Sequence, residues 1–201
     1  MLLRYKNLSL AIILSGCSVL SFAQPVLVKT EQNVEEYRLD NGLRIILAPN
    51  DKENKIFMNT VYLTGSLNDP QGKGGLAHLL EHLAFKGTEN VKGDEFQRRL
   101  DQYTLMTNAS TDYYSTKYTN VIRPEKTALS EVIFLEAERM DKLVLQEKYV
   151  PTEIDIVKRE FMYKVGIYGK NMSALTDAMA GCPTVYCGGG STFHSMRISP
   201  R

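Results

Sequence analysis

The sequence has no tryptophan, only three cysteines and only three histidines, and its charges nearly cancel. With 24 Lys and Arg residues against 23 Asp and Glu, and no long run of one sign, it lacks the basic surface of a nucleic-acid binder, so we expect no nucleic-acid partner. Beyond residue 25 no apolar run reaches the roughly eighteen residues of a membrane-spanning helix, so we expect no transmembrane span in the mature chain. The 43% hydrophobic and 23% charged residues that remain are typical of a globular protein rather than a disordered one.

Residues 1–23 have the pattern of a secretory signal peptide. Two basic residues precede an apolar stretch over residues 8–20, and a small-x-small cleavage site ends at Ala23. Residues 14–17, Leu-Ser-Gly-Cys, also resemble a bacterial lipobox, in which Cys17 would be lipidated and become the new N-terminus. Both interpretations predict export, the first as a free protein of the bacterial periplasm and the second as a lipid-anchored lipoprotein.

Strand and helix patterns alternate over most of the chain. Asp40-Asn41-Gly42 is a strong turn signal that predicts a β-hairpin over residues 34–47. Because hairpins are mixed with helices, we expect an α+β fold, a mostly antiparallel sheet covered by helices, rather than a doubly wound parallel sheet. Further strands are predicted at 57–64, 105–109 and 113–121, and helices at 76–85, at 94–103 with Asp94 as N-cap, at 124–144 with Pro124 in the first turn and an apolar stripe that includes Ile133 and Met140, and at 151–163.

The regular pattern is lost near the C-terminal end. Residues 171–201 show no clear periodicity, and we expect them to form an irregular tail behind a domain over residues 24–170. Cys182 and Cys187 could form a local disulfide in an oxidising compartment, although so short a loop would stabilise little.

The chemistry is concentrated in the predicted helix that contains His78-Leu79-Leu80-Glu81-His82. Two histidines four residues apart project from one helical face and can bind one metal ion together. Glu81 borders the same face, where its carboxylate can take a proton from a water activated by zinc. The plain alternative is a pair of ordinary histidines beside a solvated glutamate.

A catalytic zinc ion usually has three protein ligands, so a third is needed. His194 with Cys182 and Cys187 is one candidate set, but Cys-x4-Cys-x6-His is not a usual zinc spacing. Glu153 and Glu160, two turns apart on the last predicted helix, are the other candidates. From the residues alone, solvated carboxylates on an exposed face are the more common alternative for such glutamates.

His-x-x-Glu-His is an inverted zinc motif, and its surroundings resemble the pitrilysin/insulinase family of zinc metallopeptidases over roughly residues 34–165. The matching segments are Tyr37 to Leu47, Gly65-Ser66, Gly74 to Ala77, Phe85 to Thr88, Asn108-Ala109, and the pair Glu153 and Glu160. The resemblance implies the N-terminal catalytic half, a half-domain of the pitrilysin and mitochondrial processing peptidase type.

The resemblance also implies residue roles. His78, His82 and Glu160 would hold one zinc ion per chain, with Glu81 as the general base. Glu153 would support the ligands from outside the metal's own shell, as outer carboxylates do.

For the substrate, the resemblance implies that Asn108 and Ala109 lie on an edge strand that pairs with a peptide backbone. Phe85 would line a pocket for a substrate side chain. The alternatives are core packing for Phe85 and a turn position for Asn108.

The implied function is a zinc-dependent endopeptidase that hydrolyses peptides or unfolded segments through a metal-activated water. The alternative is a catalytically silent zinc-binding half or scaffold. Residues 104–107, Thr-Leu-Met-Thr, depart from the Gly-Gly that the family usually has there. The family's second homologous half has no counterpart in this sequence, so we expect a second domain or partner subunit to complete the chamber. We also expect the chain to be a truncated product that ends in a shifted reading frame.

Overall fold

The computed structural model describes residues 24–163. The chain forms two compact units, the first ending at Glu53 and the second beginning at Asn54. The predictions for the signal peptide, the tail, Cys17, Cys182, Cys187 and His194 fall outside the described residues. Within residues 24–163 no helix combines the length and apolar character needed to cross a bilayer.

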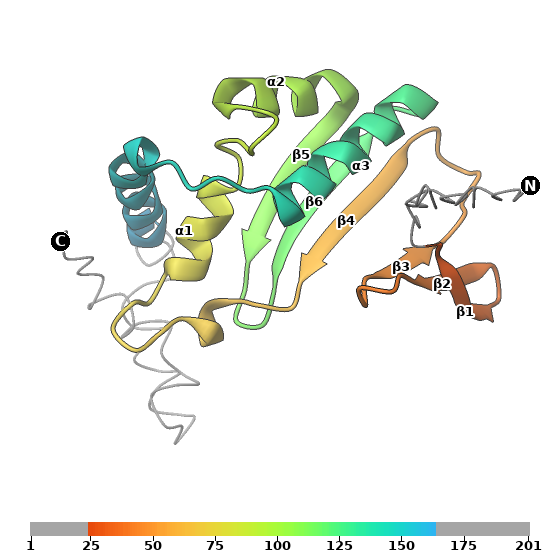
Figure 1. Cartoon of the computed structure of the whole chain (residues 1–201), viewed down its shortest axis with the longest axis horizontal. Helices are drawn as coiled ribbons and strands as arrows, with labels where there is room; N and C mark the ends of the chain where they lie inside the picture. The colour runs from red at the N-terminus through yellow and green to blue at the C-terminus, as the bar shows by residue number, and fades with distance from the viewer. Residues whose placement is uncertain (1–23, 164–201) are drawn as a thin grey trace, which may run out of the picture. The chain divides into compact units, whose positions relative to one another are not determined.

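The first unit contains a three-stranded antiparallel sheet in the order β1-β2-β3 (Figure 1). β2 (Val34–Arg38) and β3 (Arg44–Leu47) form the predicted hairpin. Its turn uses Gly42 at a φ of +87°, a region that only glycine adopts without strain. β1 (Val26–Glu31) was not predicted, and it pairs with β2.

The second unit is built on an antiparallel sheet in the order β4-β6-β5, from β4 (Ile56–Tyr62), β5 (Thr104–Thr111) and β6 (Thr116–Ile122). Along β6 every second residue is buried, so the helices cover one face of this sheet. The predicted α+β class, with an antiparallel sheet covered by helices, is therefore confirmed. The helices are α1 (Leu76–Leu83), α2 (Gly93–Tyr103), α3 (Lys126–Asp141) and one over residues 150–163, with short 3-10 turns η1 (Ser66–Asn68) and η2 (Glu147–Tyr149).

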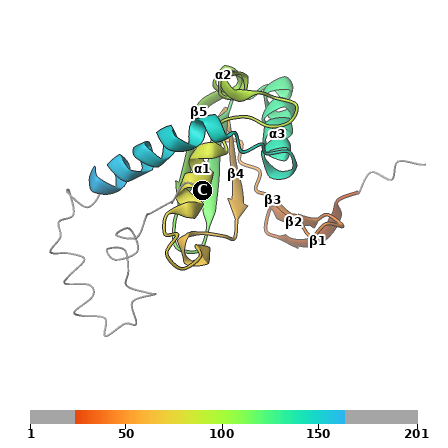
Figure 2. The same cartoon turned by 60° about the vertical axis from the view of Figure 1, so that its left-hand side comes forward.

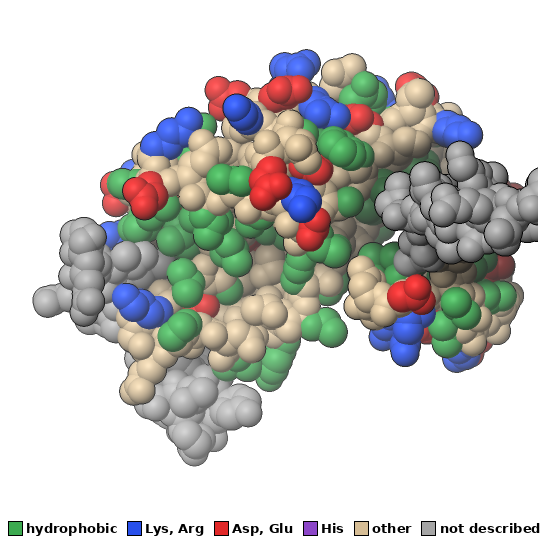
Figure 3. Space-filling view, in the orientation of Figure 1, with side chains coloured by type: hydrophobic (Ala, Val, Ile, Leu, Met, Phe, Trp, Pro, Cys, Tyr) green, Lys and Arg blue, Asp and Glu red, His purple; other side chains and the backbone are tan. Residues whose placement is uncertain are grey.

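The main core lies between β6, α2 and α3, where Phe96, Leu100, Ile122, Val132 and Leu135 are completely buried. The opposite faces of α2 and α3 meet water, and Figure 3 shows Lys, Arg, Asp and Glu side chains gathered over these two helices. Burial of each large apolar side chain contributes roughly 1.5–3 kcal/mol. This core therefore holds α2 and α3 against the sheet.

A second, smaller core joins α1 to the helix over residues 150–163. Leu79 and Leu83 of α1 pack against Val157, with Val150 and Ile154 at the margin. The two helices lie side by side in both ribbon views (Figure 1, Figure 2). Residues that are 74 or more positions apart, such as Leu83 and Val157, are thereby brought into one layer beside the sheet.

The predicted bounds of three helices were wrong in part. α1 ends at Leu83 rather than at residue 85. α2 begins at Gly93 with Lys92 in the N-cap position, so Asp94 lies inside the first turn instead of capping it. α3 begins only after Glu125, and it ends at Asp141 rather than at residue 144. The reason for the early end is that the following residues leave the helix to bridge with the segment after α1, where Thr88 pairs with Leu143.

The predicted apolar stripe of α3 was wrong in part. Ile133 and Met140 are 49% and 43% exposed, whereas Glu136, Glu138 and Arg139 are buried. These three residues form hydrogen bonds with buried partners, so hydrophobicity alone did not identify the whole inner face of this helix.

Candidate metal centre

The N-terminus of α1 is held by the carboxylate of Asp69. Its Oδ2 accepts hydrogen bonds from the backbone N–H groups of Gly75 (2.7 Å) and Leu76 (3.2 Å), and its Oδ1 accepts one from Ala77 (2.8 Å). These are donors that the start of a helix leaves without intrahelical partners, and a negative charge there also complements the helix dipole. Gly75 occupies the left-handed region at a φ of 88°, which explains a glycine at this N-cap.

The other end of α1 is held by a buried arginine from α3. Arg139 donates from Nε to the carbonyl oxygen of Ala84 (3.3 Å) and from Nη1 to Oε1 of Glu136 (2.6 Å). Its guanidinium lies 4.7 Å from the ring centre of Phe85 and 4.1 Å from that of Tyr118. The short helix that contains the histidine motif is thus fixed at both ends.

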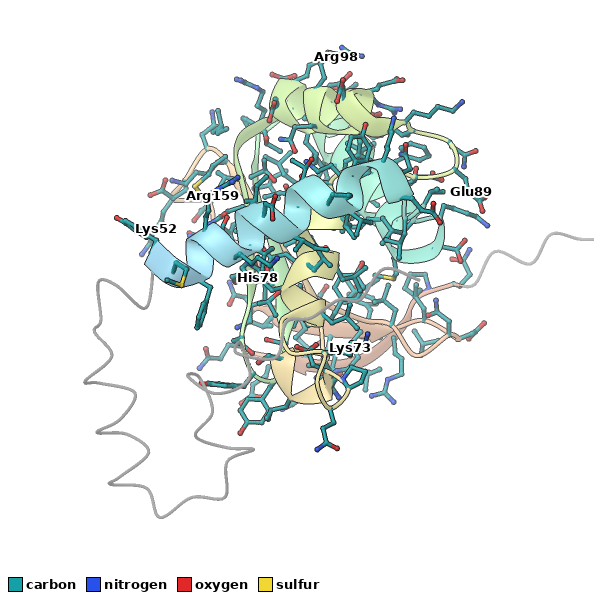
Figure 4. The ribbon with its side chains drawn as sticks, turned by 90° about the vertical axis from the view of Figure 1, so that its left-hand side faces the viewer. Lys52, Lys73, His78, Glu89, Arg98 and Arg159 are labelled. Atoms are coloured by element: carbon teal, nitrogen blue, oxygen red, sulfur yellow. The ribbon has the colours of Figure 1, made fainter. Side chains whose placement is uncertain are left out.

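Within α1 the two histidine rings lie edge to face, with their Nε2 atoms close together. The Nε2 atoms of His78 and His82 are 3.3 Å apart, and the ring planes are inclined at 75°. Figure 4 shows His78 on α1 beside the helix over residues 150–163. From that helix Glu160 places Oε2 3.4 Å from His78 Nε2 and Oε1 3.7 Å from His82 Nε2.

The three side chains fit a zinc ion. Tetrahedral zinc with bonds of about 2.0–2.1 Å separates its ligand atoms by about 3.3–3.4 Å, close to the spacings among His78, His82 and Glu160. Two imidazole nitrogens and one carboxylate are also a common donor set for catalytic zinc. Among the residues that the structure describes, this is the one group of three His, Cys, Asp or Glu side chains close enough to share an ion.

Glu153 lies behind His82, on the side away from His78. Its Oε2 is 3.1 Å from His82 Nδ1, and its Oε1 is 2.8 Å from the Nζ of Lys86. An ionised carboxylate can only accept hydrogen bonds, so the His82 proton is assigned to Nδ1 and the lone pair of Nε2 faces Glu160 and His78. That is the tautomer a metal ligand requires.

Glu81 is buried against the sheet. The hydroxyl of Thr111, the last residue of β5, donates to Glu81 Oε2 at 2.5 Å. The Oγ1 atoms of Thr111 and Thr116 are 3.4 Å apart. Glu81 therefore projects from the same helix as the histidines but is fixed by a residue of the sheet.

Asn108 and Ala109 lie on β5, which pairs with β6 and has no second neighbour among the described strands. Asn108 is exposed opposite Thr119, and Ala109 is half-buried opposite Tyr118. At residues 104–107, where the family's Gly-Gly is missing, the strand has an irregular register between Thr104 and Met106. Among the described strands, β5 is therefore an edge strand.

Phe85 is half-buried and packs against the main core. Its ring centre is 5.7 Å from that of Tyr118. These contacts are those of a core residue, and a role in a substrate pocket stays a prediction.

Three residues of this site were not identified from the sequence: Asp69, Lys86 and Thr111. Thr111 had a usable signal, because it lies two positions after Ala109 and therefore on the same face of the strand. Asp69 and Lys86 had none, because their partners are set by loops and by packing between helices.

The side chain of Tyr118, near Glu81, is buried from solvent. Burial raises the pKa of the Tyr118 hydroxyl far above its ordinary value, the positive charge of Arg139 opposes that rise, and the carboxylate of Glu81 adds to it. Because Tyr118 and Glu81 are only 4% and 7% exposed, solvent screens their electrostatic interactions weakly.

Comparisons with known proteins identify the family of the chain. Residues 45–165, more than half of the chain, match the model of the insulinase family (peptidase family M16). The zinc protease PqqE of Helicobacter pylori is 36% identical over 127 residues, which are 63% of this chain and 28% of that protein. The chain thus spans less than a third of the length of this relative.

Solved structures give the same result. The crystal structure of pitrilysin matches with a TM-score of 0.63 and 29% identity, over 77% of this chain and 17% of that one. The periplasmic protease PqqL from Escherichia coli matches with a TM-score of 0.66 over 87% of this chain and 20% of that one, but at 19% identity it shows the fold alone. Motif, fold and family model agree, and the chain belongs to the insulinase family of peptidases, family M16.

Proposed function

We propose that this chain carries the zinc site of a metalloendopeptidase that hydrolyses peptides or unfolded segments. The observation that supports this most directly is the convergence of His78, His82 and Glu160, from two helices, to zinc-like spacings. The name of the relative PqqE, a zinc protease, supports the same metal and the same reaction class.

The roles of the chain's own residues follow from their places. His78, His82 and Glu160 would hold the ion, which supplies Lewis-acid chemistry when bound. Glu81 would take the proton of the attacking water at its carboxylate, held at Oε2 by Thr111. Glu153 would hold the His82 ring.

The substrate would bind as an added strand on the free edge of β5. The backbone groups of Asn108 and Ala109 would pair with an extended peptide, and side-chain pockets such as one lined by Phe85 would select among sequences. Only an extended segment can pair in this way, which favours peptides and unfolded chains over folded proteins.

A second candidate function is a zinc-binding half that is silent alone and works with a second domain or a partner chain. The observation that favours it is the coverage, since the chain spans only 28% of the length of its relative PqqE. A partner would then complete the chamber around the β5 edge.

Export completes the proposal. The signal-peptide pattern of residues 1–23 supports it. The mass of the mature protein from a bacterial host distinguishes cleavage after Ala23 from lipidation at Cys17.

The test combines metal analysis with cleavage of an unstructured peptide. We expect one zinc ion per purified chain, cleavage that a chelator abolishes, and a Glu81→Gln variant that keeps zinc but loses cleavage. Chelator-insensitive cleavage, or full activity of the variant, would contradict the mechanism. Bound zinc without any cleavage would favour the silent half.

A further inference from the structure

Lys86 leaves the backbone at a well-fixed point just past α1. Its N–H donates to the carbonyl of Leu83 (3.0 Å), and its own carbonyl accepts a hydrogen bond from Gln146 Nε2 (2.8 Å). The next residue, Gly87, has a φ of +112°, and a Cβ there would lie 2.4 Å from the backbone nitrogen of Gly93. The chain is therefore locked where the Lys86 side chain begins.

The Lys86 side chain extends past Tyr149 to a buried carboxylate. Its Nζ lies 5.8 Å from the centre of the Tyr149 ring and 2.8 Å from Oε1 of Glu153. The Glu153 side chain is only 5% exposed, whereas that of Lys86 is 31% exposed. A carboxylate so deeply buried needs a counter-charge, and Lys86 supplies one.

Each oxygen of Glu153 thus has its own partner. Oε1 accepts from Lys86 and Oε2 accepts from Nδ1 of His82 at 3.1 Å. With both oxygens engaged, the carboxylate cannot rotate without breaking a contact. The His82 ring is then held with Nε2 toward His78 and Glu160.

We propose that Lys86 is a positioning residue of the metal centre, which acts through Glu153 on the orientation of the His82 ring. This inference rests on the proposed function, because it concerns the same zinc site. Loss of an outer hydrogen-bond partner of a ligand typically weakens metal affinity about 10–100-fold. For a group one step further out we expect the lower end, a weakening of about tenfold.

Lys148 provides a matched control. Its Nζ lies over the same Tyr149 ring, at 4.6 Å from the centre. Within the described part of the chain, the ion pairs of Glu153 are with Lys86 and His82 and not with Lys148. Lys148→Met therefore removes the same charge and a contact with the same ring, but leaves the carboxylate that faces His82 untouched.

The experiment measures zinc affinity of the full chain by competition with a chromophoric chelator. We expect Lys86→Met to weaken binding about tenfold, Lys86→Arg to retain most of the affinity, and Lys148→Met to bind as the wild type does. In a Glu153→Gln background, Lys86→Met should weaken binding no further. An unchanged affinity in Lys86→Met, or an equal loss with and without Glu153, would overturn the inference.

A second readout separates positioning from general stability and does not need zinc. In the metal-free chain, nitrogen-15 NMR of the His82 ring should show a hydrogen-bonded Nδ1–H in the wild type and in Lys86→Arg, but not in Lys86→Met. Thermal unfolding of the metal-free variants reports any purely structural effect. If the wild type binds no zinc, the proposed function fails, and the NMR comparison still decides the inference: an Nδ1–H signal that persists in Lys86→Met refutes it.

Discussion

Thr111 gives the carboxylate of Glu81 a fixed partner in a place that water hardly reaches. Glu81 is 7% exposed, and the hydroxyl of Thr111 donates to its Oε2. The donor comes from the sheet and the acceptor from α1, so this hydrogen bond sets the position of the proposed base relative to the strand where a substrate would pair. A buried carboxylate that loses such a donor keeps its desolvation cost but loses part of the hydrogen bonding that compensates for it.

Replacement of the Thr111 hydroxyl should therefore destabilise the metal-free protein. We expect Thr111→Val to lower the free energy of unfolding by about 1–3 kcal/mol, and Thr111→Ser, which keeps the hydroxyl, to lower it by less. Urea unfolding of the metal-free variants measures this. Thr119→Val is the control, since the Thr119 hydroxyl donates to Asn59 on the exposed sheet face and should change stability by no more than about 0.5 kcal/mol. Wild-type stability in the Thr111→Val variant would contradict this expectation.

The helix α1 is too short to be stable by itself. It has eight residues, and isolated helices of that length are unstable in water. Its stability comes from packing of Leu79 and Leu83 and from the contacts of Asp69 and Arg139 at its two ends. Both histidines of the metal centre are on this helix, so whatever frays α1 also displaces the ligands.

Removal of the Asp69 carboxylate should loosen α1 and weaken the zinc site together. We expect Asp69→Ala to cost about 1–2 kcal/mol, the upper range for loss of an N-cap. The backbone N–H groups of Gly75 and Ala77 lose their acceptor, and that of Leu76 keeps only the carbonyl of Lys73. Hydrogen exchange at the α1 amides should accelerate, and zinc affinity should fall. Asp101→Ala, which removes an exposed carboxylate of α2 that contacts Gln97, should leave both unchanged. If the α1 amides of Asp69→Ala exchanged as slowly as those of the wild type, the expectation would be contradicted.

Glu138 ties α3 to the segment after α1 and makes that tie sensitive to acid. Hydrogen bonds from the side chains of Asn90 (2.9 Å) and Thr88 (2.7 Å) hold the pKa of Glu138 below its ordinary value of 4.5. A carboxyl with a lowered pKa in the folded state contributes stability above its unfolded pKa and loses that contribution as the pH falls through the folded pKa.

Acid should therefore weaken the wild type more steeply than a Glu138→Gln variant. The variant should be less stable near neutral pH, because an amide cannot replace a charged acceptor for both donors. Below pH 4.5 the difference should shrink, and the urea midpoints of the two proteins, measured from pH 7 to pH 3, report it. Parallel curves over that range would show that the Glu138 contacts do not carry the expected charge dependence.

The parts of this molecule that depend on residues close together in the sequence could be predicted. The hairpin around Gly42 and the histidine pair on α1 depend on contacts within a few residues, and both are present as expected. The polar part of the inner face of α3 could not be predicted, because Glu136 and Arg139 are buried beside partners such as Asn120 and Ala84 from other elements. Lys86 was missed for the same reason, as its carboxylate partner lies 67 residues further along the chain.

The proposed zinc ion would join two helices that the sequence places far apart. His78 and His82 belong to α1, and Glu160 belongs to the helix over residues 150–163, so an ion shared by all three closes a loop of about 80 residues. A ligand that binds only the folded state stabilises it in proportion to the logarithm of its concentration over its dissociation constant. Zinc binding should therefore act as a cross-link that also strengthens the small core of Leu79, Leu83 and Val157.

Free zinc at one hundred times its dissociation constant should stabilise the folded wild type by about 2.7 kcal/mol. The thermal unfolding midpoint of the wild type should rise accordingly. Glu160→Gln should lose most of this increase, because the variant keeps the histidines but removes the charged ligand from the second helix. Asp155→Asn, which changes an exposed carboxylate of that same helix near Lys158, should keep the full increase. Equal stabilisation of the wild type and Glu160→Gln would mean that zinc binds to α1 alone and that the two helices are joined only by their apolar contact.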